Sequence, residues 1–252
     1  MHGEAAVVAK TGADSPFLLL GDHAGRDMPS RLGDLGLSEP DLSRHIAWDI
    51  GVAGLGQRLS ERLGACFIAQ RWSRLVVDCN RDPDRPDAMP AVSDGSVIPG
   101  NAALSDAERA ARVAQVFAPY HAAIAAELDA RAARGLPTVV VALHSFTPVM
   151  AGFARPWRFG VLHLGASPFS DALLARLRAE PDIGPHADDV GDNEPYAMDG
   201  VDFTIPHHAI GRGLDYAELE VRQDLLADEA GQAEVADRLA RLLPAALGDL
   251  AP

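Results

Sequence analysis

The amino-acid sequence predicts an α/β fold, a three-layer α/β/α sandwich in which helices cover both faces of one sheet. The first observation is that apolar, strand-like runs alternate with helical segments along the chain. The second is residues 137–143, PTVVVAL, a continuous apolar run of the kind buried on both faces of a sheet. The third is the pair Ser105 and Glu108, which form a capping box before an alanine-rich amphipathic helix. Because no internal repeat or interdomain linker is present, we expect a single domain over residues 1–252.

The predicted elements follow one another in a regular order. Strands are expected where short apolar runs are bounded by polar or turn-forming residues, at 17–20, 66–70, 75–77, 137–143, 159–164 and 218–221. Helices are expected at 38–64, 105–135, 170–179 and 229–243. Ser38 can cap the first helix, and Pro244 is expected to end the last one. Residues 81–103 are rich in Pro, Asp and Gly and predict a long loop, which in a compact domain is usually functional.

Composition and charge exclude several classes of protein. The formal net charge of −14 leaves no broad basic face for nucleic acid or for an anionic lipid surface. No apolar stretch reaches membrane-spanning length, and the N-terminal residues do not resemble a signal peptide, so we expect a cytoplasmic protein. Cys66 and Cys79 lack metal-binding spacing and are expected to be buried free thiols in a reducing compartment.

Polar residues with catalytic chemistry gather where the predicted strands end. In open α/β sheets, sites form outside the carboxyl ends of the strands. The residues at these places are His23, Asp78, Asn80, Arg81, His144, Glu220 and Arg222. Two imidazoles and several carboxylates suit zinc, and a catalytic zinc ion takes three protein ligands and a water molecule. The pattern therefore predicts a zinc site at one edge of the sheet.

The third metal ligand is less obvious than the two histidines. His45 and Asp49 are four residues apart on a predicted helix and would share one face of it. Asp49 lies among apolar neighbours, so its carboxylate needs a partner. Asp27 is the rival candidate because it is close to His23 in the same loop.

Six segments of the chain resemble the motifs of one known family, the N-formylglutamate amidohydrolases. They occur in the family's order between about Leu18 and Leu226, and they read GDHAGRDMP, HIAWDIG, VVDCNRDPDRP, VALHSFTP, GDNEPYA and LEVRQDLL. The family is similar in fold to the zinc carboxypeptidases, which implies a mixed, mostly parallel sheet between helices. The resemblance also implies amidohydrolase activity on N-formyl-L-glutamate, a compound of histidine degradation, with one zinc ion.

The resemblance assigns roles to individual residues. It makes His23 and His144 metal ligands. Where the carboxypeptidase motif has a glutamate three residues after its histidine, this sequence has Arg26, so Asp49 in the second motif becomes the expected third ligand. The zinc-bound water would attack the carbonyl with Glu220 as the general base.

The remaining expected roles belong to the substrate. Asn80 and Arg81 resemble the pair that grips a substrate carboxylate, and an Arg fork suits a bidentate clamp. Arg222 is expected either to stabilise the oxyanion or to orient Glu220. The alternative for Arg81 is a salt bridge within its own acidic loop.

Other interpretations remain open at this point. The same scaffold could hydrolyse another N-acyl amino acid or a small peptide, or could bind a carboxylate ligand without catalysis. The expected partner is a small anionic N-acyl amino acid, and the sequence does not fix the oligomeric state. His207, His208 and Glu194 are further candidates for the site without an assigned role, and Ser145 is expected to support His144.

Overall fold

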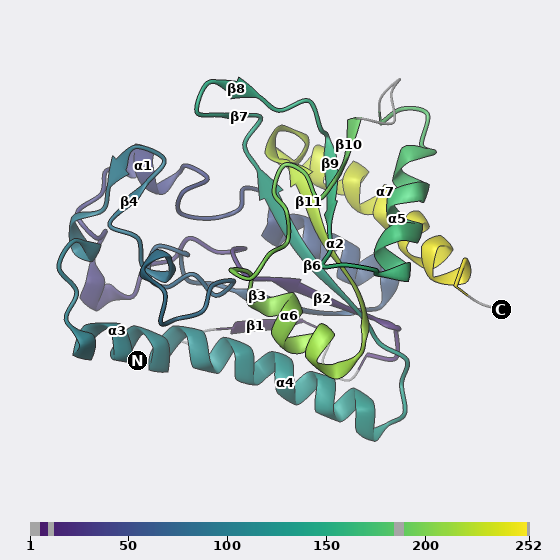
Figure 1. Cartoon of the computed structure of the whole chain (residues 1–252), viewed down its shortest axis with the longest axis horizontal. Helices are drawn as coiled ribbons and strands as arrows, with labels where there is room; N and C mark the ends of the chain where they lie inside the picture. The colour runs from purple at the N-terminus through teal and green to yellow at the C-terminus, as the bar shows by residue number, and fades with distance from the viewer. Residues whose placement is uncertain (1–5, 10–12, 184–188, 251–252) are drawn as a thin grey trace.

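The computed structural model describes the backbone of residues 6–9 and all of residues 13–183 and 189–250. A seven-stranded sheet forms its centre, in the order β1-β3-β2-β6-β11-β9-β10 (Figure 1). The strands are β1 Ala6–Ala9, β2 Phe17–Gly21, β3 Cys66–Gln70, β6 Val139–Phe146, β9 Phe159–Leu162, β10 Val190–Asp192 and β11 Asp215–Arg222.

The sheet is mixed and mostly parallel, as predicted. The four strands β3, β2, β6 and β11 run parallel to one another. β1 pairs antiparallel with β3 and β9 pairs antiparallel with β11, whereas β10 is parallel to β9. All eight residues of β6 are buried, which fits its continuous apolar sequence and its central place in the sheet.

Helices cover both faces of the sheet, which confirms the α/β class. One face packs on α2 Val52–Leu63, α5 Pro168–Arg178 and α7 Glu229–Gly248. The other face packs on α4 Ala118–Ala133 and α6 Thr204–His208. Leu18 and Leu19 illustrate how alternating residues of β2 supply the two cores, because each belongs to a different one. Figure 1 shows α4 lying across one side of the sheet and α5 and α7 on the other.

Shorter elements connect these layers. The remaining helices and hairpin strands are α1 Glu39–Leu42, α3 Asp106–Arg112, β4 Val92–Ser93, β5 Ser96–Val97, β7 Val149–Met150 and β8 Phe153–Ala154. Single helical turns lie at Ser30–Leu32, Pro86–Ala88, Pro99–Asn101, Ile210–Arg212 and Gln223–Leu226. The capping box at Ser105 and Glu108 is present, and the predicted helix that follows it is interrupted by a π-helical turn at Val113–Phe117.

The single helix predicted over residues 38–64 is wrong, because the chain forms only α1 and α2 there with turns between them. Gly51 stands before α2 with φ at 83°, a left-handed conformation that glycine adopts without strain. It packs so closely on Leu226 that an added Cβ atom would lie 2.4 Å from the Leu226 Cβ. Consequently, His45 and Asp49 do not share a helix face.

Two smaller predictions also differ from the structure. Residues 75–77 are buried but form no strand, because their backbone runs through turns beside the sheet. Pro244 lies inside α7 rather than ending it, and the buried Leu242, Leu243 and Ala246 hold this part of the helix against the core. No helix among the described residues is long and apolar enough to cross a membrane.

Candidate metal centre and active site

Three parallel strands bring the predicted catalytic residues to one edge of the sheet. His23 lies two residues beyond the end of β2, and His144 and Glu220 lie near the carboxyl ends of β6 and β11. β6 and β11 are in a register that places His144 opposite Glu220. The site therefore forms where a parallel sheet collects the ends of its strands.

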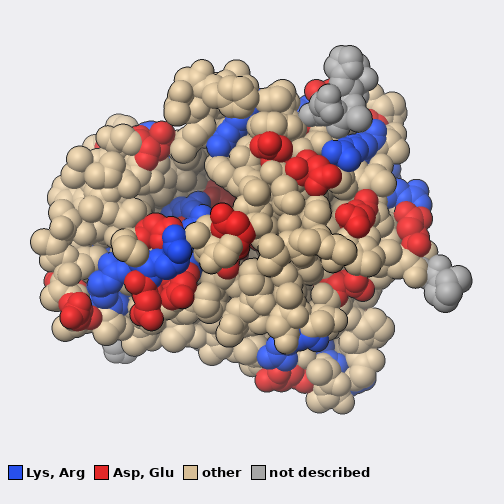
Figure 2. Space-filling view, in the orientation of Figure 1, with Lys and Arg blue, Asp and Glu red and all other residues tan. Residues whose placement is uncertain are grey.

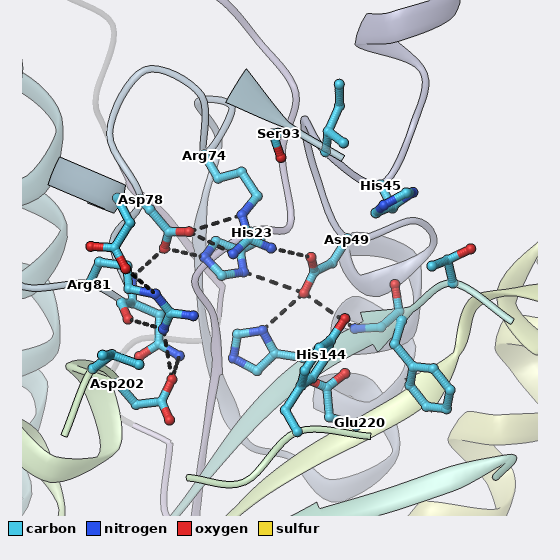
Figure 3. A pocket seen from close by; sticks show the side chains of 18 of the residues that line it. His23, His45, Asp49, Arg74, Asp78, Arg81, Ser93, His144, Asp202 and Glu220 are labelled. Carbon is cyan, nitrogen blue, oxygen red and sulfur yellow. Dashed lines mark hydrogen bonds and ion pairs between the residues drawn. The ribbon is translucent and has the colours of Figure 1, made fainter. Parts of the chain in front are cut away.

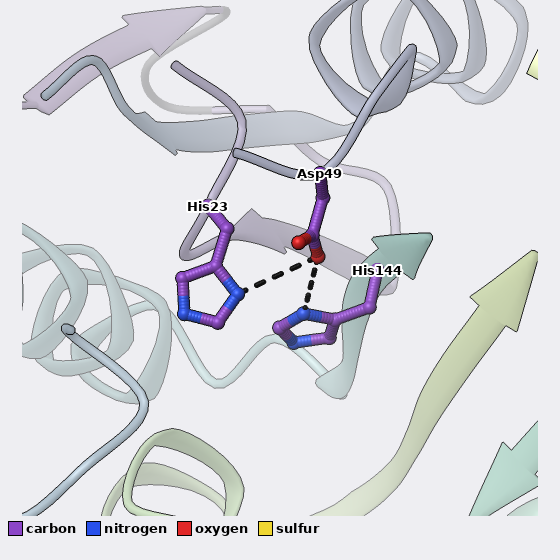
Figure 4. Close-up of side chains that lie close together, drawn as sticks. All are labelled: His23, Asp49 and His144. Carbon is purple, nitrogen blue, oxygen red and sulfur yellow. Dashed lines mark hydrogen bonds and ion pairs between the residues drawn. The ribbon is translucent and has the colours of Figure 1, made fainter. Parts of the chain in front are cut away.

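His23, Asp49 and His144 form a buried group that could hold a metal ion (Figure 4). Their candidate ligand atoms all lie within 4.8 Å of one another. Asp49 Oδ2 is 3.4 Å from His23 Nδ1 and 2.9 Å from His144 Nδ1. Two ligands of a tetrahedral zinc ion lie about 3.4 Å apart when each bond is about 2.1 Å long. The two distances from Asp49 to the histidines are close to that value.

Backbone contacts position Asp49 even though it lies outside a helix. Its amide N–H donates to the carbonyl of His23 at 2.8 Å, which ties the turn before α2 to the end of β2. The amide of Ser145 donates to Asp49 Oδ2 at 3.3 Å, and the Ser145 hydroxyl donates to the carbonyl of Ile50 at 2.9 Å. Ser145 thus holds the Asp49 turn rather than acting as a nucleophile.

Further carboxylates lie behind the two histidines. His23 Nε2 is 2.6 Å from Asp78 Oδ1, and His144 Nε2 is 3.4 Å from Asp22 Oδ2. Asp22 is itself fixed by the hydroxyls of Tyr120 and Thr204, which donate to its Oδ1. Metal-binding histidines commonly donate the N–H of their second ring nitrogen to a carboxylate, as His23 can to Asp78, whereas His144 Nε2 faces Asp22 without a hydrogen bond. With Nε2 facing Asp78 and Asp22, both rings turn Nδ1 toward Asp49.

The residues present fit a divalent metal ion. His23 Nδ1 is buried and makes no hydrogen bond to a described residue, although it faces the Asp49 carboxylate. Burial alone would raise the pKa of Asp49, but the neighbouring His23 and His144 hold it below its usual range. Asp49 is therefore ionised, and one carboxylate with two imidazoles is a donor set that zinc prefers.

Two buried glutamates on β11 face the same site. Glu218 and Glu220 are almost fully buried, and each has an Oε2 atom without a hydrogen-bond partner among the described residues. Burial raises the pKa of Glu220 to about 7, and burial also raises the pKa of Glu218. A carboxylate with a pKa near neutrality suits the exchange of a proton during catalysis.

The candidate metal centre and the two glutamates line a cavity of about 540 Å³ (Figure 3). Segments on either side form its walls, including the loop of residues 81–103 and the hairpin of β7 and β8, which contributes Met150. In the space-filling view the surface is hollowed near its centre, and acidic and basic side chains both gather at the edge (Figure 2). The long loop predicted from the sequence therefore lines the site.

Asn80 and Arg81 also line the cavity, where each already has partners within the protein. Arg81 Nη1 donates to Asp202 Oδ1 at 2.8 Å. Asn80 Oδ1 accepts from the backbone amides of Phe203 and Thr204, at the start of α6. Arg81 thus hydrogen-bonds to Asp202, a residue far away in the sequence, and its Nε also lies 3.8 Å from Asp87 Oδ2 in its own loop.

The structure does not bring every candidate to the cavity. Arg222 ends β11 with its guanidinium on Asp224, at 2.8 Å, and close to the carbonyls of Arg155 and Pro156. It does not line the cavity, because its side chain leaves the site where the strand ends. Asp27 pairs with Arg71 at the surface, and Glu194 lines a different pocket. The structure therefore places Asp49, and not Asp27, beside the histidines.

Among the three unassigned histidines, only His45 lines the cavity. Its Nε2 is 3.4 Å from Asp94 Oδ2, and burial lowers its pKa. His207 is exposed and stacks on Phe203. His208 is buried and lies 2.9 Å from His121, whose other ring nitrogen donates to the carbonyl of Cys79.

The His121–His208 pair predicts a loss of stability in mild acid. Burial lowers the pKa of His121 to about 4 and that of His208 to about 3, so the unfolded chain binds more protons below pH 6.5. Each residue should lower the free energy of unfolding by about 1.4 kcal/mol per pH unit as pH falls from about 6 to about 4.5. Urea denaturation across this range measures the slope. His208→Gln should reduce the slope by about one proton, and an unchanged slope would contradict the assignment.

Several site residues could not be found from the sequence. Arg74 joins Asp78 to Asp49, with its Nη1 3.3 Å from Asp49 Oδ1. The RWSR segment that contains Arg74 carries no sequence motif that would predict these contacts. Asp202 reaches Arg81 from more than a hundred residues away. Glu218 did leave a signal, because strand alternation places it on the same face as Glu220.

The fold and the site define a hydrolase of the α/β structural class, built around a candidate metal centre. The family model described as N-formylglutamate amidohydrolase matches residues 15–227, and the chain belongs to this amidohydrolase family. This confirms the resemblance seen in the sequence motifs. No curated protein matches the chain.

Two solved structures are similar to this one over nearly their whole length. A gene product of Agrobacterium tumefaciens is 40% identical, with a TM-score of 0.93 over 99% of this chain and 97% of that chain. An N-formylglutamate amidohydrolase from Ralstonia eutropha is 20% identical, with a TM-score of 0.66 over 97% of this chain and 98% of that chain. At that identity the second structure supports the fold alone.

Proposed function

We propose that this protein is a zinc-dependent hydrolase that cleaves the amide bond of an N-acyl amino acid, with N-formyl-L-glutamate as the first substrate to test. The observation that carries the proposal is the meeting of His23, Asp49 and His144 with the unpaired carboxylate of Glu220 at one buried sheet edge. A zinc ion bound to the three side chains would polarise the amide carbonyl and lower the pKa of a water molecule to about 7.

The protein's own residues supply the rest of the chemistry. Glu220 accepts the proton of the attacking water and returns it to the nitrogen of the leaving amine. The amide C–N bond breaks, and a free amino acid and the acid of the acyl group are released. Asp78 and Asp22 keep the rings of His23 and His144 oriented throughout.

Arg81 is proposed to hold the α-carboxylate of the substrate. Its Nε and Nη2 make no hydrogen bond to a described residue, so one edge of the guanidinium is available. Arg81→Lys should raise KM by about tenfold or more while metal content is retained, because lysine cannot present a planar fork. Steady-state kinetics and metal analysis of the same preparation measure both. An unchanged KM would mean that Arg81 only anchors Asp202.

A substrate panel tests the proposed function directly. Metal-loaded protein is incubated with N-formyl and N-acetyl derivatives of several amino acids, and release of the free amino acid is followed. We expect turnover that a chelator abolishes and added zinc restores. Binding of these compounds without turnover would favour a carboxylate-binding protein instead, and the absence of both would reject the proposal.

A further inference from the structure

Acidic side chains outnumber basic ones around the cavity. Among the described residues that line it, the basic side chains other than histidine are Arg74 and Arg81. The carboxylates that line it are Asp49, Asp78, Asp87, Asp94, Asp199, Asp202, Glu218 and Glu220. The number of carboxylates that a substrate can carry into the cavity therefore depends on how many N–H donors of Arg74 and Arg81 have no partner within the protein.

Arg74 has no capacity for a substrate carboxylate. Its Nε and Nη2 donate to Asp78 Oδ2 at 3.0 and 2.6 Å, and its Nη1 donates to Asp49 Oδ1 at 3.3 Å. All three nitrogens thus hold carboxylates of the candidate metal centre in place. Taking Arg74 away from these partners would leave two buried carboxylates without their cation, which is costly.

Arg81 is half occupied by the protein. Its Nη1 donates to Asp202 Oδ1 at 2.8 Å and to the Asn80 carbonyl at 2.9 Å, and its Nε is 3.8 Å from Asp87 Oδ2. Figure 3 shows Arg81 and Asp202 facing each other below Asp78. Nε and Nη2 make no hydrogen bond to a described residue, so this edge of the guanidinium provides for one carboxylate.

Asp202 is a fixed part of this wall. Its side chain is 10% exposed, and its Oδ2 accepts the backbone amide of Asp199 at 3.2 Å. Asn80 Nδ2 also lies 3.4 Å from Asp202 Oδ1, and a β-bridge joins the backbones of Arg81 and Asp202. Contacts of the Asp202 side chain and of the Asp202 backbone therefore both keep its carboxylate beside Arg81.

Among the described residues that line the cavity, the rim adds no further cation; Arg155 lies behind it, with its Nη1 on the Thr147 carbonyl and the Tyr196 hydroxyl. Asp87 and Asp94 are matched from outside the cavity by Arg85 at 2.9 Å and Arg44 at 2.6 Å. Neither of these arginines lines the cavity. Asp199 forms no salt bridge with an arginine or lysine among the described residues, so this part of the wall keeps a negative charge.

We propose that Asp202 is a specificity-determining residue that restricts the site to N-acyl amino acids with one carboxylate and a neutral or positively charged side chain. The proposal rests on the proposed function and names its substrate class. N-formylglutamate carries two carboxylates; the first can bind the free edge of Arg81, and the second would meet the negative charges of Asp202 and Asp199, where the described lining residues offer it no further cation. The cavity of about 540 Å³ lies within the range for drug-sized ligands, so charge rather than size selects the side chain.

An isosteric pair of substrates tests the charge preference. N-formyl-L-glutamine and N-formyl-L-glutamate have nearly the same shape and differ by one negative charge. For metal-loaded protein we expect kcat/KM to be at least about tenfold higher for the glutamine compound. Calorimetric titration with the N-acetyl forms of the same two amino acids measures the preference without turnover, and the glutamine form should bind more tightly.

Asp202→Asn tests which carboxylate sets the preference. Asparagine keeps the shape and can still accept the amide of Asp199, but it frees the charge of Arg81. The variant should shift the ratio of the two kcat/KM values toward glutamate by about tenfold. Asp199→Asn removes one charge from the same segment without touching Arg81, and it should shift the ratio by at most a few fold.

The outcomes separate this inference from the proposed function. Turnover with a clear preference for N-formylglutamate, or an Asp202→Asn variant with an unchanged ratio, would overturn the inference and leave the proposed function intact. If Asp202→Asn does not fold, the wild-type preference still decides. If no compound is turned over, the calorimetric titrations decide. The inference is overturned if the glutamate form binds as tightly as the glutamine form or more tightly, or if neither form binds.

Discussion

Replacing Glu220 by glutamine is expected to lower kcat by roughly 10²–10⁴, the usual contribution of a positioned general base. Glutamine preserves the size of the side chain but cannot accept a proton from the attacking water. Glu220 is buried at the end of β11, opposite His144 in register, and burial raises its pKa to about 7. Steady-state kinetics measure the loss, and metal analysis should show a normal content, since Glu220 is not assigned as a ligand.

Glu218→Gln is the matched control on the same strand and face. Burial raises the pKa of Glu218, which favours its protonated form, and an amide imitates that form. We expect a much smaller loss than for Glu220→Gln. A larger loss in the Glu218 variant would assign the base to Glu218, and loss of metal in Glu220→Gln would make Glu220 a ligand.

The second large effect is expected from the candidate metal ligands. Alanine at His23, Asp49 or His144 should weaken zinc binding by more than 100-fold, because loss of a residue behind a ligand already costs 10–100-fold. Titration against a chelating dye measures the affinity. Activity at fixed zinc should fall in parallel.

Two control variants distinguish ligands from their neighbours. His45→Ala removes an imidazole from the cavity wall, and Asp27→Ala removes the rival carboxylate, which pairs with Arg71 at the surface. Both should retain zinc at nearly normal affinity. Loss of zinc from Asp27→Ala together with its retention in Asp49→Ala would show that the third ligand was assigned wrongly.

The sequence predicted the parts of the site that local signals define. The apolar runs before His23 and His144 mark central strands, and their carboxyl ends meet because parallel strands point the same way. The alternation of the last strand likewise placed Glu220 on the opposite face from Leu219 and Val221, which pack in the core. These features depend on neighbours in sequence, so a pattern can reveal them.

The parts that sequence reasoning missed depend on contacts between distant segments. The helical pattern continues through residues 43–51, but the chain turns there because the Asp49 amide bonds to the His23 carbonyl. Arg222 was expected at the site from its place at a strand end, yet its guanidinium binds the carboxylate of Asp224 two residues later. The pairing of Arg81 with Asp202 likewise has no signal in either local sequence.

The contact between Gly51 and Leu226 has a consequence for the geometry of catalysis. Gly51 follows the turn that carries Asp49, and Leu226 belongs to the turn that follows the strand carrying Glu220. An added Cβ would also lie 2.6 Å from the Leu226 carbonyl oxygen, so any side chain at position 51 would push the two turns apart. The absence of a side chain at Gly51 therefore lets the two turns pack in direct contact. This contact helps to set the distance between the Asp49 carboxylate, which would hold an ion, and the Glu220 carboxylate, which would accept a proton.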